Sequence, residues 1–125
     1  MNTLLLKILI TFSLLFLIII TGIWLTKSGR PLNSKIFAIH KIISVSTIVL
    51  SFFFISQITK QFGISQMALI FLILTIVFIV SEIVTGTLLS FEKPISTIIL
   101  LLHKIIPILI IVCSGFLFYF LTLKR

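Results

Sequence analysis

Two histidines, His40 and His103, are the residues of this chain best suited to chemistry, because each lies inside a long apolar stretch. Polar side chains inside a lipid bilayer are costly and usually serve a function. Imidazole is a standard axial ligand of haem iron, and it also forms hydrogen bonds between membrane helices. A bound cofactor and a purely structural contact are therefore the two interpretations of these residues.

An internal repeat surrounds both histidines. Each half of the chain contains a Thr-Gly pair, then a basic residue followed by proline, then the sequence His-Lys-Ile-Ile. The interval from proline to histidine is nine residues in both halves. We predict a single transmembrane domain, residues 1–125, made of repeat 1, about 1–60, and repeat 2, about 64–125. The matched elements are Thr21-Gly22, Arg30-Pro31 and His40–Ile43 in the first repeat, and Thr85-Gly86, Lys93-Pro94 and His103–Ile106 in the second.

The repeated neighbours of the histidines suit one haem b with His40 and His103 as its axial ligands. Glycines without a Cβ would let a flat macrocycle approach the backbone, although small-residue packing between helices is the alternative. Threonine hydroxyls would accept a hydrogen bond from the second imidazole nitrogen and fix the tautomer. Basic side chains would form a cationic rim for the haem propionates. These candidates are Gly22, Gly86, Thr21 and Thr85, with the rim residues Arg30, Lys35, Lys41, Lys93 and Lys104.

Glu82 breaks the repeat, because its counterpart in the first half is Ile18. We expect Glu82 at a depth similar to that of the histidines. It is a candidate proton site, and the alternative is a neutral, hydrogen-bonded carboxyl group.

Pro107 predicts a bend in the last span, because a proline leaves the carbonyl four residues earlier, that of His103, without its usual donor. The matching residue in the first repeat is Ser44, which can bend a helix by bonding back to a carbonyl.

The high apolar content of the chain predicts that the segments carrying these residues lie in a lipid bilayer. Of 125 residues, 60% are apolar and 10% are charged, whereas soluble domains are about one quarter charged. Each of four apolar spans is long enough to cross the hydrocarbon core as a helix, the only open-chain structure that satisfies its own backbone there. The predicted spans are about Leu4–Thr26, Ser34–Gln57, Ser65–Ser90 and Ile95–Leu123.

The predicted fold is an all-α membrane protein, a four-transmembrane-helix bundle made of two parallel two-helix repeats. Short loops make neighbouring helices antiparallel, so both halves have the same orientation and the histidines lie on one side. From these spans, His40 lies about 9 Å and His103 about 12 Å into its helix.

The net charge of +8 fits basic residues at the lipid headgroups better than nucleic-acid binding, because the chain has no basic face outside its spans. The apolar run from Ile8 to Leu25 is longer than a signal-peptide core, and we expect it to stay in the membrane as a helix. Slightly more basic residues lie at loop 1 (residues 27–33) and loop 3 (residues 91–94) than at the other side. This bias weakly predicts that loops 1 and 3 are cytoplasmic, in a bacterial plasma membrane.

The His-Lys pairs after short loops and the Thr-Gly pairs resemble the small four-helix b-type cytochromes of the di-haem cytochrome b and ferric-reductase-like superfamily. The resemblance implies histidine-ligated haem b and electron exchange with quinones. With two histidines, His40 and His103, this chain would be a single-haem variant.

The leading hypothesis is a cytochrome that passes electrons between a quinone pool or membrane partner and an acceptor, with possible oxidoreductase activity. One alternative is a small proton- or cation-coupled transporter or channel that uses Glu82 and the histidines. The other is a cofactor-free accessory subunit of a membrane complex.

Overall fold

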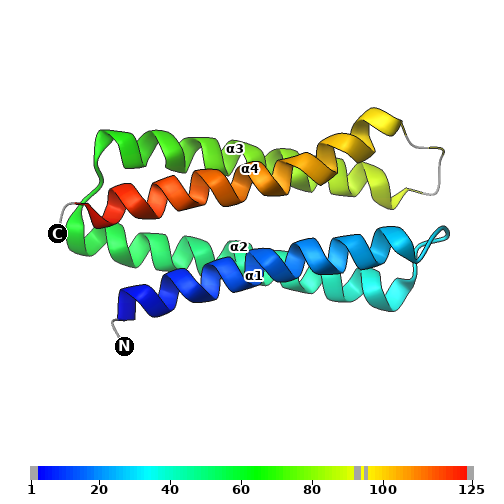
Figure 1. Cartoon of the computed structure of the whole chain (residues 1–125), viewed down its shortest axis with the longest axis horizontal. Coiled ribbons are helices and arrows are strands. Elements are labelled where there is room, and N and C mark those ends of the chain that lie inside the picture. The colour runs from blue at the N-terminus through cyan, green and yellow to red at the C-terminus, as the bar shows by residue number, and fades with distance from the viewer. Residues whose placement is uncertain (1–2, 92–93, 95, 124–125) are drawn as a thin grey trace. The chain divides into compact units, whose positions relative to one another are not determined.

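The computed structural model describes residues 3–91, 94 and 96–123, which form four helices and no strand (Figure 1). All four helices are long and apolar enough to cross a membrane. The prediction of an all-α membrane protein with four transmembrane helices is therefore confirmed. The helices are α1 (Thr3–Lys27), α2 (Ser34–Phe62), α3 (Gln66–Ser90) and α4 (Thr97–Thr122).

The chain divides into two compact units, Met1–Gln61 and Phe62–Arg125. The first hairpin is α1 and α2, which are joined by the contact between Thr21 and His40. The second hairpin is α3 and α4, which pack along their length. In each hairpin the two helices run antiparallel, as Figure 1 shows. Each hairpin therefore places one Thr-Gly pair beside one histidine.

Two helix boundaries differ by more than one residue from the sequence prediction. Helix α2 continues beyond Gln57 to Phe62 and ends before Gly63, whose positive φ of 71° suits a residue without a Cβ. Its last turn contains the polar residues Thr59, Lys60 and Gln61, which suit the headgroup region of a membrane better than its hydrocarbon core. The predicted start of the fourth span, Ile95, lies outside the described residues. Helix α4 begins at Thr97, after Ser96, whose hydroxyl accepts the Ile98 N–H (3.3 Å).

The corrected start of α4 refines the depth of the two histidines. His40 lies six residues after Ser34, the first residue of α2, and His103 lies six residues after Thr97. At 1.5 Å per residue, each is about 9 Å into its helix. The difference of about 3 Å expected from the sequence came from starting the fourth span at Ile95.

The buried positions of α1 recur in α3 at a constant interval of 64 residues. Only these four positions are buried in each of the two helices, and all the other described residues of α1 and α3 are at least partly exposed. The helices thus use the same narrow stripe to contact their partners. The pairs are Leu4 and Ala68, Thr11 and Thr75, Thr21 and Thr85, and Leu25 and Leu89.

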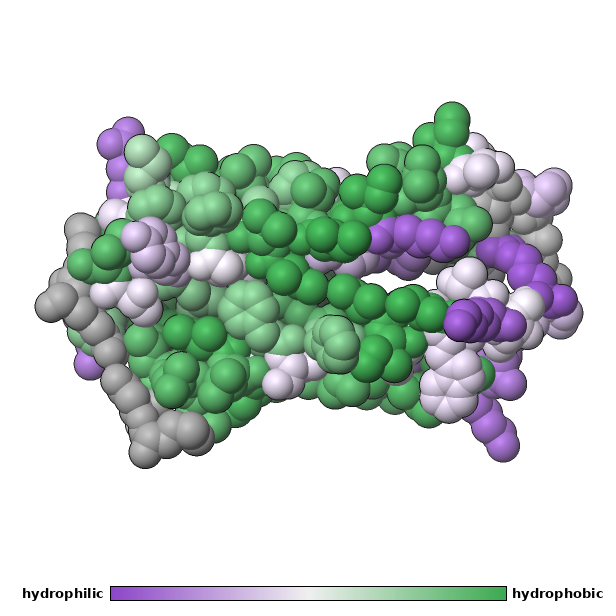
Figure 2. Space-filling model, viewed as in Figure 1, coloured by the Kyte–Doolittle hydropathy of each residue, from purple (hydrophilic) through white to green (hydrophobic). Residues whose placement is uncertain are grey.

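Large apolar side chains cover the outside of the helices. Phe52 is 75% exposed and Ile98 is 68% exposed. In Figure 2 the middle of the helices is apolar and hydrophilic residues gather towards their ends. Such a surface would be unfavourable in water, and it matches the hydrocarbon core of a bilayer.

Candidate functional site

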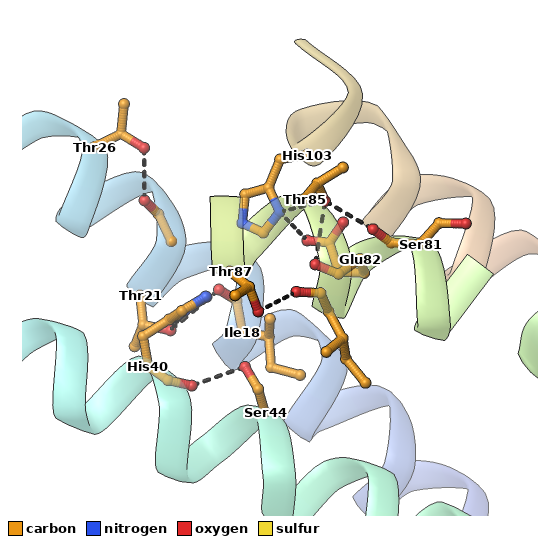
Figure 3. A network of polar contacts seen from close by, with 12 residues as sticks. Ile18, Thr21, Thr26, His40, Ser44, Ser81, Glu82, Thr85, Thr87 and His103 are labelled. Atoms are coloured by element: carbon orange, nitrogen blue, oxygen red, sulfur yellow. Dashed lines mark hydrogen bonds and ion pairs between the residues drawn. The ribbon is translucent and has the colours of Figure 1, made fainter. Parts of the chain in front are cut away.

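The first hairpin holds His40 through a threonine on the neighbouring helix. Thr21, on α1, is 6% exposed, and its Oγ1 lies 2.9 Å from Nδ1 of His40 (Figure 3). The same hydroxyl donates its single proton to the Leu17 carbonyl at 2.8 Å. When the hydroxyl donates to this carbonyl it accepts from the imidazole, and that arrangement corresponds to the Nδ1–H tautomer of His40. In this tautomer Nε2 carries the lone pair that a metal ion can use.

The second hairpin repeats this arrangement. Thr85, on α3, is 8% exposed, and its Oγ1 lies 3.0 Å from Nδ1 of His103, on α4. Its hydroxyl proton is directed at the carbonyls of Ser81 (3.0 Å) and Glu82 (3.1 Å). The Thr–His contacts expected from the sequence are therefore present in both hairpins. In the Nδ1–H tautomer each imidazole has its lone pair on Nε2.

The repeated glycines accommodate the imidazole rings. A Cβ added to Gly22 would lie 3.3 Å from Cε1 of His40, and one added to Gly86 would lie 3.0 Å from Cε1 of His103. The neighbour that the structure gives each glycine is thus the histidine of its own hairpin. Close approach of a macrocycle to these glycines stays a prediction. Each Thr-Gly pair supplies a hydrogen-bond acceptor and the adjoining space for one ring.

An acidic side chain contacts only the second of these histidines among the described residues. Oε1 of Glu82 lies 3.0 Å from Nδ1 of His103, and the two side chains are 19% and 22% exposed. Figure 3 shows Glu82 and Thr85 converging on the same side of the ring. The Nδ1–H of His103 is therefore shared between a hydroxyl and a carboxylate oxygen.

The residue four places after each histidine alters the hydrogen bonding of that histidine's backbone carbonyl. Ser44 Oγ donates to the His40 carbonyl at 2.8 Å, which is the back-bonding predicted for this residue. At the matching place in α4, Pro107 has no N–H to donate to the His103 carbonyl. The first turns of α4 are angled away from the rest of the helix in Figure 1, as expected for a bend near proline.

The described residues of the predicted rim lie at or near the helix ends that are closest to the histidines. The side chains of Arg30, Lys35, Lys41 and Lys104 are exposed. Lys93 lies outside the described residues. Their role towards haem propionates stays a prediction.

Sequence reasoning missed a second pair of buried threonines, Thr11 and Thr75, which are 3% and 5% exposed. Each donates to the carbonyl four residues earlier, at 3.0 Å and 2.8 Å. The signal was present, because both precede the Thr-Gly pair by ten residues. These residues extend the repeat along α1 and α3.

Comparison with known proteins gives no relative: no family model, curated protein or solved structure matches this chain. The resemblance to b-type cytochromes therefore rests on the residues described above.

Proposed function

We propose that this chain is a membrane b-type cytochrome that binds one haem, with His40 and His103 as the axial ligands. The observation that carries the proposal is the repeated orientation of the two imidazoles. In each hairpin a helix-anchored threonine accepts the Nδ1–H, so Nε2 is the coordinating atom.

The donor set fits this cofactor better than a bare metal ion. Among the described residues there is no cluster of three or more His, Cys, Asp or Glu side chains. A porphyrin supplies four nitrogen ligands itself, so two neutral imidazoles complete the coordination of haem iron. With two histidines in the sequence, the chain can hold at most one such haem.

The bound haem would supply one-electron chemistry, and the protein residues would bind and orient it. The threonines fix the ligand tautomers, and the glycines make room for the rings. The exposed cations Arg30, Lys35, Lys41 and Lys104, together with Lys93, would attract the propionates. We propose electron exchange between a quinone pool or membrane partner and an acceptor on the same side. The proposed location is a bacterial plasma membrane with loops 1 and 3 in the cytoplasm.

The decisive experiment is the absorption spectrum of the full-length chain purified from membranes with added haem precursor. We expect a Soret band and one haem per chain. His40→Ala or His103→Ala should each lower haem affinity by more than about 100-fold, because loss of an outer-shell partner alone costs 10–100-fold. No Soret band, or an unchanged spectrum in both histidine variants, contradicts the proposal.

Matched controls exist two residues after each histidine. Ile42 and Ile105 occupy equivalent positions of the repeat and are 65% and 43% exposed. Ile42→Ala and Ile105→Ala remove apolar side chains from the same helix turns without touching the imidazoles. Both should keep the full haem content, which separates ligand loss from general damage to α2 or α4.

A second candidate, a proton- or cation-coupled transporter, is favoured by the contact of Glu82 with His103 inside two apolar helices. Ion-driven uptake into liposomes that is lost in Glu82→Gln would favour it over the cytochrome. Stoichiometric copurification with other membrane proteins, without any cofactor, would instead favour an accessory subunit.

A further inference from the structure

The two histidines have different surroundings because the repeat is broken at one position. Glu82 corresponds to Ile18, 64 residues earlier, and residues 1–61 contain no Asp or Glu. The first hairpin therefore cannot offer His40 a carboxylate of its own. Thr21 and Thr85, in contrast, are identical partners of the two rings.

The carboxylate of Glu82 is directed at the imidazole from within its own hairpin. Its Oε1 and the Oγ1 of Thr85 each lie 3.0 Å from Nδ1 of His103. A negatively charged acceptor attracts the shared proton more strongly than a hydroxyl does. Electron density on the ring then increases, and Nε2 becomes a better donor to a metal ion.

The second oxygen of Glu82 supports a specific role for this contact. Oε2 is buried and has no hydrogen-bond partner among the described residues. Leaving a buried carboxylate oxygen without a partner costs free energy, so such a group in a native structure needs an explanation. Packing alone does not require it, because the first hairpin places isoleucine at the same position. The contact with His103 is the interaction that distinguishes the two hairpins here.

We infer that Glu82 is a positioning residue that increases the electron donation of His103 as an axial ligand and thereby stabilises the oxidised haem iron. This inference rests on the proposed haem ligation by His40 and His103. It adds a role for the acidic residue that the second hairpin has in place of Ile18.

The test is a redox titration of the haem-loaded full-length chain carrying Glu82→Ile, which reproduces the first hairpin. Haem should stay bound through both histidines. The equilibrium constant for reduction should increase about tenfold, which is about 59 mV towards positive potential for one electron. The low-spin electron paramagnetic resonance spectrum should shift in parallel, which a purely structural role of Glu82 would not produce.

Two further variants keep the inference falsifiable. Glu82→Gln keeps the size and an acceptor oxygen without the charge, and should restore part of the wild-type potential even if Glu82→Ile folds poorly. Ser81→Leu reproduces Leu17 of the first hairpin at the adjacent position and should leave the potential unchanged. An unchanged potential in haem-loaded Glu82→Ile or Glu82→Gln overturns the inference, whereas lack of haem in the wild-type chain overturns the proposed function instead.

Discussion

The two hairpins share their histidine setting and differ in the polar groups around it. Thr21 and Thr85 contact His40 and His103 at 2.9 and 3.0 Å, so the two rings are held in the same way. Only the second hairpin adds a carboxylate, that of Glu82. The residues that orient the ring are thus repeated, and the residue that alters its electronic surroundings is not.

At the hairpin ends far from the histidines, the first hairpin has the polar contact and the second has an apolar one. In the first, the Lys7 ammonium donates to the side-chain carbonyl of Gln57. The positions that correspond to these residues in the second hairpin hold Phe71 and Phe120, whose rings stack with centroids 5.7 Å apart and planes at 16°. A polar contact at a helix end has therefore been exchanged for an aromatic one.

These differences show which parts of the repeat are constrained. The constraint is strict where a helix must pass within van der Waals distance of an imidazole. It is relaxed where the two helices only need matching partners, which can be polar or aromatic. Substitutions at equivalent positions of the two hairpins test whether the positions beside the imidazoles are more constrained than those at the far ends.

The largest difference should come from removing the threonine hydroxyls. Thr21→Val should cost about 1–3 kcal/mol, because it removes the hydroxyl that lies 2.9 Å from Nδ1 of His40. Thr85→Val should cost less, because Oε1 of Glu82 still lies 3.0 Å from Nδ1 of His103. The free energy of unfolding, measured in mixed detergent micelles, checks both values. Equal costs would show that Glu82 is not an effective acceptor for His103.

A smaller difference is expected at the glycines. An added Cβ lies 3.0 Å from Cε1 of His103 at Gly86 but 3.3 Å from Cε1 of His40 at Gly22. Overpacking costs about 1–3 kcal/mol, and Gly→Ala in a helix returns about 1 kcal/mol. Gly86→Ala should therefore destabilise by about 1 kcal/mol, and Gly22→Ala should be close to neutral.

The same unfolding measurement applies to the glycine variants, with Gly115→Ala as a control. Gly115 lies in α4 twelve residues after His103, which is about 18 Å along the helix axis. If Gly22→Ala destabilises as much as Gly86→Ala, the two rings are packed equally tightly. The comparison of the hairpins would then have to rest on Glu82 alone.

The smallest effect should appear at the far ends. A double-mutant cycle of Phe71→Ala and Phe120→Ala should give a coupling of about 1 kcal/mol, typical of stacked aromatic pairs. The cycle of Lys7→Ala and Gln57→Ala should give about 0.6 kcal/mol, the average for polar contacts between membrane helices. A larger coupling for the polar pair would show that the Lys7–Gln57 contact stabilises its hairpin more than the aromatic contact does.

Much of the fold was predictable from the sequence, because lipid permits few solutions. Apolar spans of sufficient length must be helices, and the four spans were found within a few residues of the observed bounds. The errors came at polar ends, such as the turn after Gln57, where hydropathy no longer separates helix from loop. Thr11 and Thr75 were overlooked because isolated threonines in apolar runs are common in membrane helices.

The sequence by itself determined that two histidines occupy equivalent places in a repeat, because residue spacing alone fixes helical depth and order. The tertiary structure decided what touches them. Only packing of α1 on α2, and of α3 on α4, shows that the glycines make room for the imidazoles and that the threonine hydroxyls lie at hydrogen-bond distance from them. The same packing assigned Glu82 to His103, since contacts between helices depend on their rotation about their axes, which spacing along one helix does not specify.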